Sequence, residues 1–261
     1  MAIYHFEMKP VRRRDGRSAT AAAAYWSASK IFDEATGLTI DRTRDRRVVH
    51  TEIILPASCI DCDWARDRQT LWNSAERAER RSNARVARAY ELALPHELSD
   101  EQRTSLTHEF AQRIADRYLV AVDASIHGAA STGNSRNFHA HLLTTTRVVE
   151  REGLGKKSAM ELSSGDRMRA GLGSAIGELL FLREFWAAAA NAQLEQAGSD
   201  ARIDHRRLAA QGIERAPQRR RGVALTALLR RKQETAVGQR LHDEEFAEDK
   251  PAAAVSVARD S

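Results

Sequence analysis

Short stretches in which apolar and polar positions alternate recur along the chain, and this alternation predicts strands with one buried face. Pro56 and Pro95 end two of these stretches. The segment between the last two stretches is rich in Gly, Ser, Thr and Asn, so we expect an antiparallel hairpin there. The predicted strands are residues 2–8, 36–41 (a short strand or hairpin), 48–55, 86–94, 119–127 and 138–143.

Other segments place apolar residues every three to four positions, which is the spacing of a helix with one buried face. Ser18 can cap the first of them, whose many alanines would let its backbone lie close against a sheet. The predicted helices are residues 19–30, 64–82, 99–118 and 175–197, the last ended by Gly198. Because strands and helices are interspersed and the clearest hairpin is antiparallel, we predict an α+β fold with helices packed on an antiparallel sheet.

The periodic pattern is weaker in the second half of the chain. Residues 149–169 are polar and glycine-bearing. From Gln218 onward a basic run is followed by a short helical stretch, and residues 243–249 are mostly acidic. We expect residues 217–261 to form a mobile tail, basic and then acidic, that is helical or disordered.

The amino-acid composition indicates a class of binding partner. The chain has 261 residues, is 42% hydrophobic and carries a net charge of +5, with a pI of about 9.5. This basic balance is typical of proteins that meet polyanions, and nucleic acid is the leading partner. No apolar stretch has the length needed to cross a bilayer, and the first residues do not have the layout of a signal peptide. We therefore expect a cytoplasmic protein without membrane insertion.

The two cysteines of the chain, Cys59 and Cys62, are separated by two residues. This spacing occurs in redox pairs and in one half of a zinc site. A second pair that would complete a zinc site is missing nearby, and neither interpretation is strong.

Three histidines form the clearest chemical signal. His139 and His141 flank a single residue of a predicted strand, so their side chains point to the same face. His127 ends the strand before them and can supply a third ligand. Neutral imidazole is a frequent ligand of divalent transition metals, and three of them leave coordination positions open for substrate oxygens. The trio predicts a metal that acts as a Lewis acid, although any one of these histidines alone would more often be an ordinary polar residue.

Tyr25 is the candidate nucleophile. A tyrosine hydroxyl can attack phosphorus when a cation neutralises the phosphate, and the product is a covalent phosphotyrosine. Considered alone, a tyrosine in an alanine-rich helix more often serves packing.

Several motifs occur in the same order as in a known family. They are residues 1–6 (MAIYHF), 16–19 (GRSA), 22–25 (AAAY), 90–95 (YELALP), 137–143 (NFHAHLL), 200–206 (DARIDHR) and 211–215 (QGIER), together with His127. On these residues the chain resembles the MobA/MobL conjugative relaxases of the HUH endonuclease superfamily. The resemblance covers residues 1 to about 216, which we take as the expected relaxase domain.

Members of that family nick one DNA strand at a plasmid transfer origin, become joined to its 5′ end through a tyrosine, and later rejoin the strand. The resemblance implies the same enzyme here, a site- and strand-specific endonuclease and transesterase with Tyr25 as nucleophile. It assigns His127, His139 and His141 as ligands of a divalent cation, Mg²⁺ or Mn²⁺. Glu91 matches an acidic residue that the family places beside the site, where it would orient a ligand histidine or accept the tyrosine proton. Its ordinary alternative is a carboxylate on the rim.

The resemblance also implies a relaxase-like sheet of about five antiparallel strands with flanking helices. The implied substrate is single-stranded DNA at a transfer origin. Accessory mobilisation proteins and a type IV coupling protein are further implied partners.

Other polar residues are candidates for DNA contact. Arg17 and Ser18 precede the helix of Tyr25, where a guanidinium and a helix N-terminus both favour phosphate. Trp26 can stack on a base. The remaining candidates are Arg42, Arg44, Arg46 and Arg47, which can follow the DNA backbone, and His205 and Arg206, which can contact DNA or close over it. A solvated face is the commoner role of an arginine run, and a structural turn is the commoner role of residues 204–206.

Three alternatives stay open. The chain can be a non-catalytic DNA-binding mobilisation accessory protein, or a rolling-circle replication initiator that uses the same chemistry. A zinc hydrolase of small substrates would explain the histidines but neither the basic balance nor Tyr25. After Pro217 the chain also departs from the family pattern, which puts in doubt how its C-terminal part closes on DNA.

Overall fold

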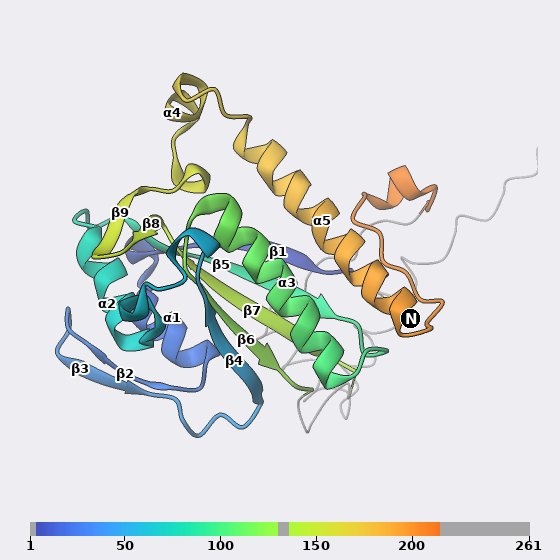
Figure 1. The fold of residues 1–261 in the computed structure, drawn as a ribbon, viewed down its shortest axis with the longest axis horizontal. Helices are drawn as coiled ribbons and strands as arrows, with labels where there is room; N and C mark the ends of the chain where they lie inside the picture. The colour runs from blue at the N-terminus through green and yellow to red at the C-terminus, as the bar shows by residue number, and fades with distance from the viewer. Residues whose placement is uncertain (1–3, 130–135, 215–261) are drawn as a thin grey trace, which may run out of the picture. The chain divides into compact units, whose positions relative to one another are not determined.

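The computed structural model describes residues 4–129 and 136–214. A five-stranded sheet with the strand order β1-β5-β7-β6-β4 forms its centre (Figure 1). Every neighbouring pair in this sheet is antiparallel, which confirms the predicted α+β class and the expected number of strands. The strands are β1 (Phe6–Arg12), β4 (Val48–Ile54), β5 (Arg85–Leu94), β6 (Val122–His127) and β7 (Phe138–Thr145).

Two small hairpins stand beside this sheet. The first pairs β2 (Lys30–Asp33) with β3 (Leu38–Asp41), and the second pairs β8 (Arg147–Glu150) with β9 (Gly153–Lys157). From residue 149 onward, the second hairpin lies in the polar, glycine-bearing stretch for which the sequence pattern predicted no element.

Helices and short 3-10 turns complete the described part of the chain. The α-helices are α1 (Ala19–Trp26), α2 (Arg68–Ala78), α3 (Asp100–Tyr118), α4 (Ser164–Arg169) and α5 (Ala175–Gln196). The 3-10 turns are η1 (Arg13–Asp15), η2 (Ala57–Cys59), η3 (Asp63–Arg66), η4 (Ala159–Glu161) and η5 (Leu208–Gln211). Gly198 follows α5 with a positive φ of 68°, as expected for the residue that ends a helix.

Helix α1 is shorter than the sequence predicted, and its predicted end at residue 30 is wrong. The Ser27 hydroxyl donates to the carbonyl of Ala23 at 2.7 Å, and Ala28 then adopts a left-handed φ of 50° that a continuing helix does not allow. The chain turns there into β2, in which Ile31 and Asp33 are buried and the residues between them are exposed.

The two faces of the sheet belong to different cores. On one face, apolar residues such as Tyr90, Leu92 and Leu142 pack with α3 and α5, which lie across the strands in Figure 1. On the other face, Ala87 and Leu143 belong to the core that includes α1 and α2. Side chains two positions apart share a face, so the histidines that alternate with Leu142 lie on the side of α1 and α2.

The chain divides into two compact units, residues 1–205 and residues 206–261. Within the second unit the structure describes residues 206–214, which include η5. The tail expected over residues 217–261 lies outside the described residues. Among the described helices, none combines the length and the apolar character that crossing a membrane requires.

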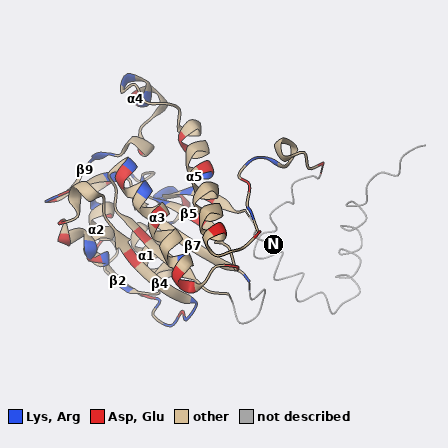
Figure 2. Cartoon of the chain, turned by 45° about the vertical axis from the view of Figure 1, so that its right-hand side comes forward, with Lys and Arg blue, Asp and Glu red and all other residues tan. Residues whose placement is uncertain are grey.

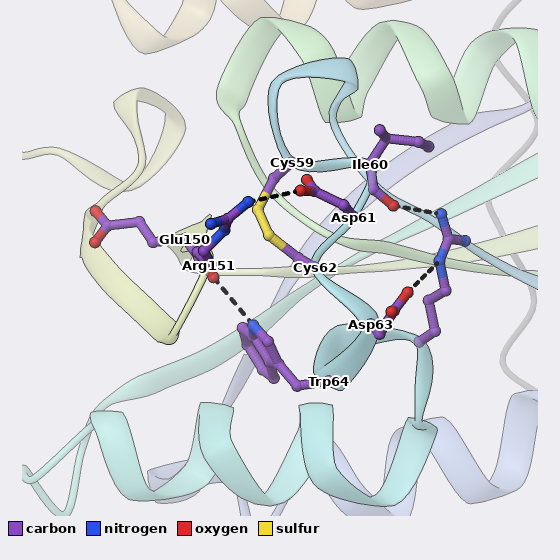
Figure 3. Close-up of a disulfide and its surroundings, with 9 residues drawn as sticks. Cys59, Ile60, Asp61, Cys62, Asp63, Trp64, Glu150 and Arg151 are labelled. Atoms are coloured by element: carbon purple, nitrogen blue, oxygen red, sulfur yellow. Dashed lines mark hydrogen bonds and ion pairs between the residues drawn. A yellow bond between two sulfur atoms is a disulfide. The ribbon is translucent and has the colours of Figure 1, made fainter.

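Cys59 and Cys62 form a disulfide in the connection between β4 and α2 (Figure 3). The indole of Trp64 donates to the carbonyl of Glu150 at 3.0 Å, and Arg151 donates to Asp61 at the same distance. These bonds connect the disulfide loop to the β8–β9 hairpin. Because the two sulfur atoms are bonded to each other, the zinc interpretation of this pair is wrong.

Glu76 of α2 fixes the start of α1. Its carboxylate is 5% exposed and accepts the backbone N–H of Ala19 at 2.6 Å. The same carboxylate accepts two hydrogen bonds from Arg13, at 3.0 and 2.7 Å. Ser18 caps the helix through a 3.1 Å bond from the N–H of Ala21. One buried acid therefore holds the chain on both sides of the turn that precedes α1.

We expect Glu76→Ala to lower the free energy of unfolding by about 3 kcal/mol, because it leaves a partly buried guanidinium and a buried N–H without an acceptor. Urea unfolding followed by circular dichroism measures the change. Arg77→Ala is the matched control, since its ion pair with Glu34 is exposed and should contribute less than about 0.5 kcal/mol. Equal losses in the two variants would contradict the assignment.

Candidate metal centre and active site

The antiparallel register brings the three histidines together. His127 of β6 is directly opposite His139 of β7, and His141 follows two residues later on the same face. The ring centroids are 4.7 to 5.2 Å apart. One nitrogen from each ring lies within 4.8 Å of the others, which is close enough for all three to hold one ion.

Burial keeps these imidazoles neutral. It is the main cause that lowers the pKa of His127, His139 and His141, and for His141 the value falls to about 2. The positive charge of neighbouring groups, Arg47 among them, adds to this effect. A neutral imidazole keeps the lone pair that a metal requires.

The hydrogen-bond pattern of the trio leaves ring nitrogens whose lone pairs are available to a metal ion. In the tautomer that carries its proton on Nε2, His127 donates to the carbonyl of Trp26 at 2.7 Å, which leaves its Nδ1 with a lone pair. The Nδ1 atoms of His139 and His141 are buried and have no hydrogen-bond partner within residues 4–129 and 136–214. Buried polar atoms normally have a partner, and a divalent cation would supply one to each. The trio therefore fits the predicted metal.

The C-terminal end of α1 packs directly on this cluster. The ring of Trp26 stacks on His141 with a centroid distance of 5.0 Å and an interplanar angle of 3°. Together with the bond from His127 to the Trp26 carbonyl, this contact fixes the helix end on the histidines. Tyr25 is the preceding residue, and 44% of its surface is exposed. The candidate nucleophile is thus the neighbour in sequence of Trp26, the residue that contacts two of the candidate metal ligands.

Tyr25 faces a pocket of about 540 Å³ on the connection between β3 and β4. Arg42 and Arg44 line this pocket together with Asp41 and Asp45, and the guanidinium of Arg42 lies 5.8 Å from the tyrosine ring centroid. Basic residues follow this connection below β2 and β4 in Figure 2. Over residues 41–47, four arginines against two aspartates leave an excess of positive charge beside the accessible Tyr25 hydroxyl.

Arg47 links the tyrosine to the histidines. Hydrogen bonds to Asp45 and to Tyr25 raise the pKa of this guanidinium. The bond from its Nε to Asp45 measures 2.9 Å, and the same contact lowers the pKa of the Asp45 carboxyl to about 2. Since Arg47 also lowers the pKa of His141, a permanent cation lies beside both parts of the site.

Glu91 shares the face of the trio. It is directly opposite His141 in the β5–β7 register, and one of its carboxylate oxygens lies 3.7 Å from Nε2 of His5. His5, Glu7 and Glu91 form a second group of side chains whose potential ligand atoms lie within 4.8 Å of one another. The sequence reasoning did not single out His5 or Glu7. The alternation of the first strand, which places both on one face, is the signal that would have found them.

The other sequence candidates occupy several different elements of the chain. Ser18 caps the opposite end of α1, about 10 Å along an eight-residue helix, and Arg17 beside it is exposed. Arg46 is exposed in the β3–β4 connection. The carbonyl of His205 accepts a 2.8 Å bond from Arg183, and Arg206 is an exposed residue of the second unit. DNA contact by these residues stays a prediction.

Several known proteins are similar to this chain in sequence. The sequence model of the MobA/MobL family matches residues 17–231. The mobilization protein MobL of Acidithiobacillus ferridurans is 38% identical over 93% of this chain and 67% of its own length. The conjugal transfer protein TraA of Agrobacterium fabrum is 35% identical over 96% of this chain, but the match spans only 24% of TraA.

Two solved structures share the fold. One comes from a study of the molecular basis of vancomycin resistance transfer in Staphylococcus aureus. It has a TM-score of 0.68 and 31% identity, and the match covers 79% of this chain and 100% of that one. The other is the conjugative relaxase TrwC in a metal-bound complex with oriT DNA, with a TM-score of 0.50, 10% identity, and coverage of 97% and 87%. At that identity the second likeness shows the fold alone.

The family match extends over most of the chain, and the MobL relative is similar along nearly all of it. Both agree with the order of motifs in the sequence and with the relaxase-like sheet. The chain therefore belongs to the MobA/MobL family, as the motifs had indicated.

Proposed function

We propose that this chain is a DNA relaxase that nicks one strand at a plasmid transfer origin through Tyr25 and later rejoins it. The observation that carries the proposal is the packing of the Trp26 end of α1 on the three histidines, which brings Tyr25 beside a candidate metal centre. Membership of a family whose relatives are named mobilization and conjugal transfer proteins supports the DNA substrate.

The residues that would hold the cation are His127, His139 and His141. A divalent cation bound there, Mg²⁺ or Mn²⁺, would supply Lewis-acid chemistry by withdrawing electron density from the phosphate oxygens. Holding three neutral nitrogens in place before substrate arrives is the contribution of the chain itself.

In the proposed cleavage step a bond forms between the Tyr25 hydroxyl oxygen and the phosphorus, and the bond from phosphorus to the 3′ oxygen breaks. The tyrosine proton passes to a base, and the 3′ oxygen leaves as a hydroxyl after it takes up a proton. Arg47, which hydrogen-bonds Tyr25, would place a positive charge beside the oxygen that attacks phosphorus. Glu91, on the same face, would accept the tyrosine proton or orient His141, which is directly opposite it.

Rejoining is the reverse reaction. The 3′ hydroxyl attacks the phosphotyrosine, the phosphodiester reforms, and Tyr25 recovers its proton. One phosphate ester replaces another in each direction, so no external energy source is needed. The exposed position of Tyr25 suits this cycle, because a second strand end can reach the same oxygen.

The arginines that line the Tyr25 pocket, Arg42 and Arg44, would hold phosphates near the scissile bond. Trp26 would stack on a base with the part of its ring that His141 leaves uncovered. Arg17, Ser18, Arg46, His205 and Arg206 complete the proposed DNA-binding set. Accessory mobilisation proteins, a type IV coupling protein and a cytoplasmic location belong to the proposal as well.

We expect the chain to form a covalent adduct with single-stranded DNA in the presence of Mn²⁺, and Tyr25→Phe to abolish it, since phenylalanine has no oxygen to attack phosphorus. The chain is incubated with a random-sequence oligonucleotide library, denatured in detergent, and examined by intact-protein mass spectrometry. Sequencing of the attached DNA identifies the origin.

Tyr4→Phe is the matched control, because the Tyr4 hydroxyl contacts the carbonyl of Arg183 on another part of the molecule. An adduct that persists in Tyr25→Phe, or its absence from the unaltered chain, would overturn the proposed function.

We expect His141→Ala to weaken Mn²⁺ binding by roughly 100-fold or more, since even residues that only support metal ligands contribute 10- to 100-fold. Isothermal titration calorimetry with Mn²⁺ measures the affinity. His108→Ala serves as the control because His108 is half exposed and pairs with Glu52 at 3.0 Å, outside the trio. The metal assignment fails if the two variants bind Mn²⁺ equally well.

A further inference from the structure

Two arginines of the connection between β3 and β4 contact the side chain of Tyr25. The guanidinium of Arg42 lies 5.8 Å from the centre of the tyrosine ring, within the range of a cation–π contact. The guanidinium of Arg47 hydrogen-bonds the tyrosine hydroxyl. Because 44% of Tyr25 is exposed, packing restricts its rotamer less than it restricts that of a buried tyrosine. The two arginine contacts therefore have a large share in deciding where the hydroxyl lies.

Arg47 can hold Tyr25 in place only if its own side chain is held. Its side chain is long and 47% exposed, so solvent alone would leave it several rotamers. The carboxylate of Asp45 supplies a partner, since Nε of Arg47 donates to Oδ1 at 2.9 Å and Nη2 donates to Oδ2. Two parallel hydrogen bonds fix the plane of a guanidinium and leave further N–H groups available to the Tyr25 oxygen.

The backbone of the connection fixes this carboxylate in turn. Oδ1 of Asp45 also accepts the backbone N–H of Arg47 at 3.1 Å, which is the turn in which an aspartate bonds the residue two positions later. The N–H of Asp45 donates to the carbonyl of Arg42 at 3.0 Å, and the N–H of Arg42 donates to the carbonyl of Ser29 at 3.1 Å. Only 18% of the Asp45 side chain is exposed. Asp45 is therefore part of an ordered turn.

The same turn is attached to the strand of His127. The carbonyl of Arg47 accepts the N–H of Gly128 at 2.8 Å, and Val48 lies opposite His127 in the β4–β6 register. Arg47 is thus connected to the strand of a candidate metal ligand through its backbone and to Tyr25 through its side chain. An ordered guanidinium at this point relates the position of the tyrosine hydroxyl to that of the histidines.

The charge of Asp45 is unfavourable for the substrate. A carboxylate near Tyr25 repels phosphate and offsets one of the four arginines in residues 41–47. As a surface charge alone, Asp45 would only weaken DNA binding. Its hydrogen bonds to Arg47 make a contribution of the opposite sign, because misplacing a reacting atom by about 1 Å can cost on the order of 100-fold in rate.

From these contacts we propose that Asp45 is a positioning residue for the nucleophile, which orients the guanidinium of Arg47 so that Arg47 keeps the Tyr25 hydroxyl in place. Asp45 acts through Arg47 and not on the phosphate itself. The inference rests on the proposed function, because it concerns the oxygen that attacks phosphorus. It separates the holding of the nucleophile from the binding of metal and of DNA.

The test measures the single-turnover rate of adduct formation with Mn²⁺ and the oligonucleotide that the unaltered chain selects from the library. We expect Arg47→Ala to lower the rate roughly 100-fold, because a donor at a reacting oxygen is lost. Asp45→Asn should lower it roughly tenfold, because the donor remains but is no longer oriented.

The binding affinities should not follow the rate. In Asp45→Asn the affinity for the same oligonucleotide, measured by fluorescence anisotropy, should rise or stay within about twofold, since a negative charge leaves a basic surface. Mn²⁺ affinity, measured by calorimetry, should also stay within about twofold because the three histidines are unchanged. A role of Asp45 as surface charge alone predicts the opposite result, tighter binding without a slower reaction.

The double variant Asp45→Asn/Arg47→Ala distinguishes positioning from a separate structural role. If Asp45 acts through Arg47, the double variant reacts as slowly as Arg47→Ala and no slower. Added methylguanidinium should accelerate Arg47→Ala by about fivefold or more, because the Asp45 carboxylate remains to hold it, and should accelerate the double variant by less than about twofold.

Asp61→Asn is the matched control, because Asp61 accepts a 3.0 Å bond from Arg151 in an exposed pair on the disulfide loop. Its rate should equal that of the unaltered chain. The inference is overturned by an unchanged rate in Asp45→Asn, by an equal loss in Asp61→Asn, by losses that multiply in the double variant, or by a loss of affinity that accounts for the slower rate. If the unaltered chain forms no adduct, the proposed function fails, whereas an adduct that forms independently of Asp45 contradicts this inference alone.

Discussion

The register of three neighbouring strands is the constraint on which the site depends. In β6 and β7 it sets His127 opposite His139, and in β5 and β7 it sets Glu91 opposite His141. A shift of one residue would turn the whole set to the opposite face, onto α3 and α5. The buried residues that alternate with the histidines, such as Ala140 and Leu142, prevent this shift because they must remain in the core under those helices. Hydrophobic packing on one face of the sheet thus positions polar chemistry on the other.

Helix α1 converts this arrangement into a candidate active site. Its start is fixed by the buried Glu76 and its end by Trp26, so the helix that carries Tyr25 is held at both termini. The alanines between them remove the side chains that would keep the helix away from the sheet, and Ala23 and Ala24 are buried. Because both ends of the helix are attached, Tyr25 is exposed to substrate while its position stays fixed.

The sequence predicted most of the elements that build the site, but only those whose pattern lies within a few neighbouring residues. The His-x-His spacing, the Ser18 cap and the alternation of β5 each act within a few residues, and their elements are present. The end of α1 was missed because the helical pattern continues past Ser27, and the left-handed turn at Ala28 depends on where β2 must pair. The contact of Arg47 with Tyr25 and the pairing of His5 with Glu91 join segments far apart in the chain. No spacing rule encodes such contacts, since they follow from the strand order.

Charge is organised in the same way at both ends of the sheet. At the Tyr25 site Asp45 holds Arg47. At the corner where β1 ends and β5 begins, Glu79 and Glu161 hold Arg147, Lys157 and Arg85. In each place acids anchor some of the cations and so fix the surface. Residues 41–47 carry four arginines against two aspartates, and the lining of the β1–β5 corner carries seven basic residues against one acid, so both places keep a surplus of positive charge. A net charge of +5 spread evenly over the chain would attract DNA without orienting it. Concentrated at fixed places along one sheet, the same excess would hold phosphates at defined positions, which evenly spread charge does not do.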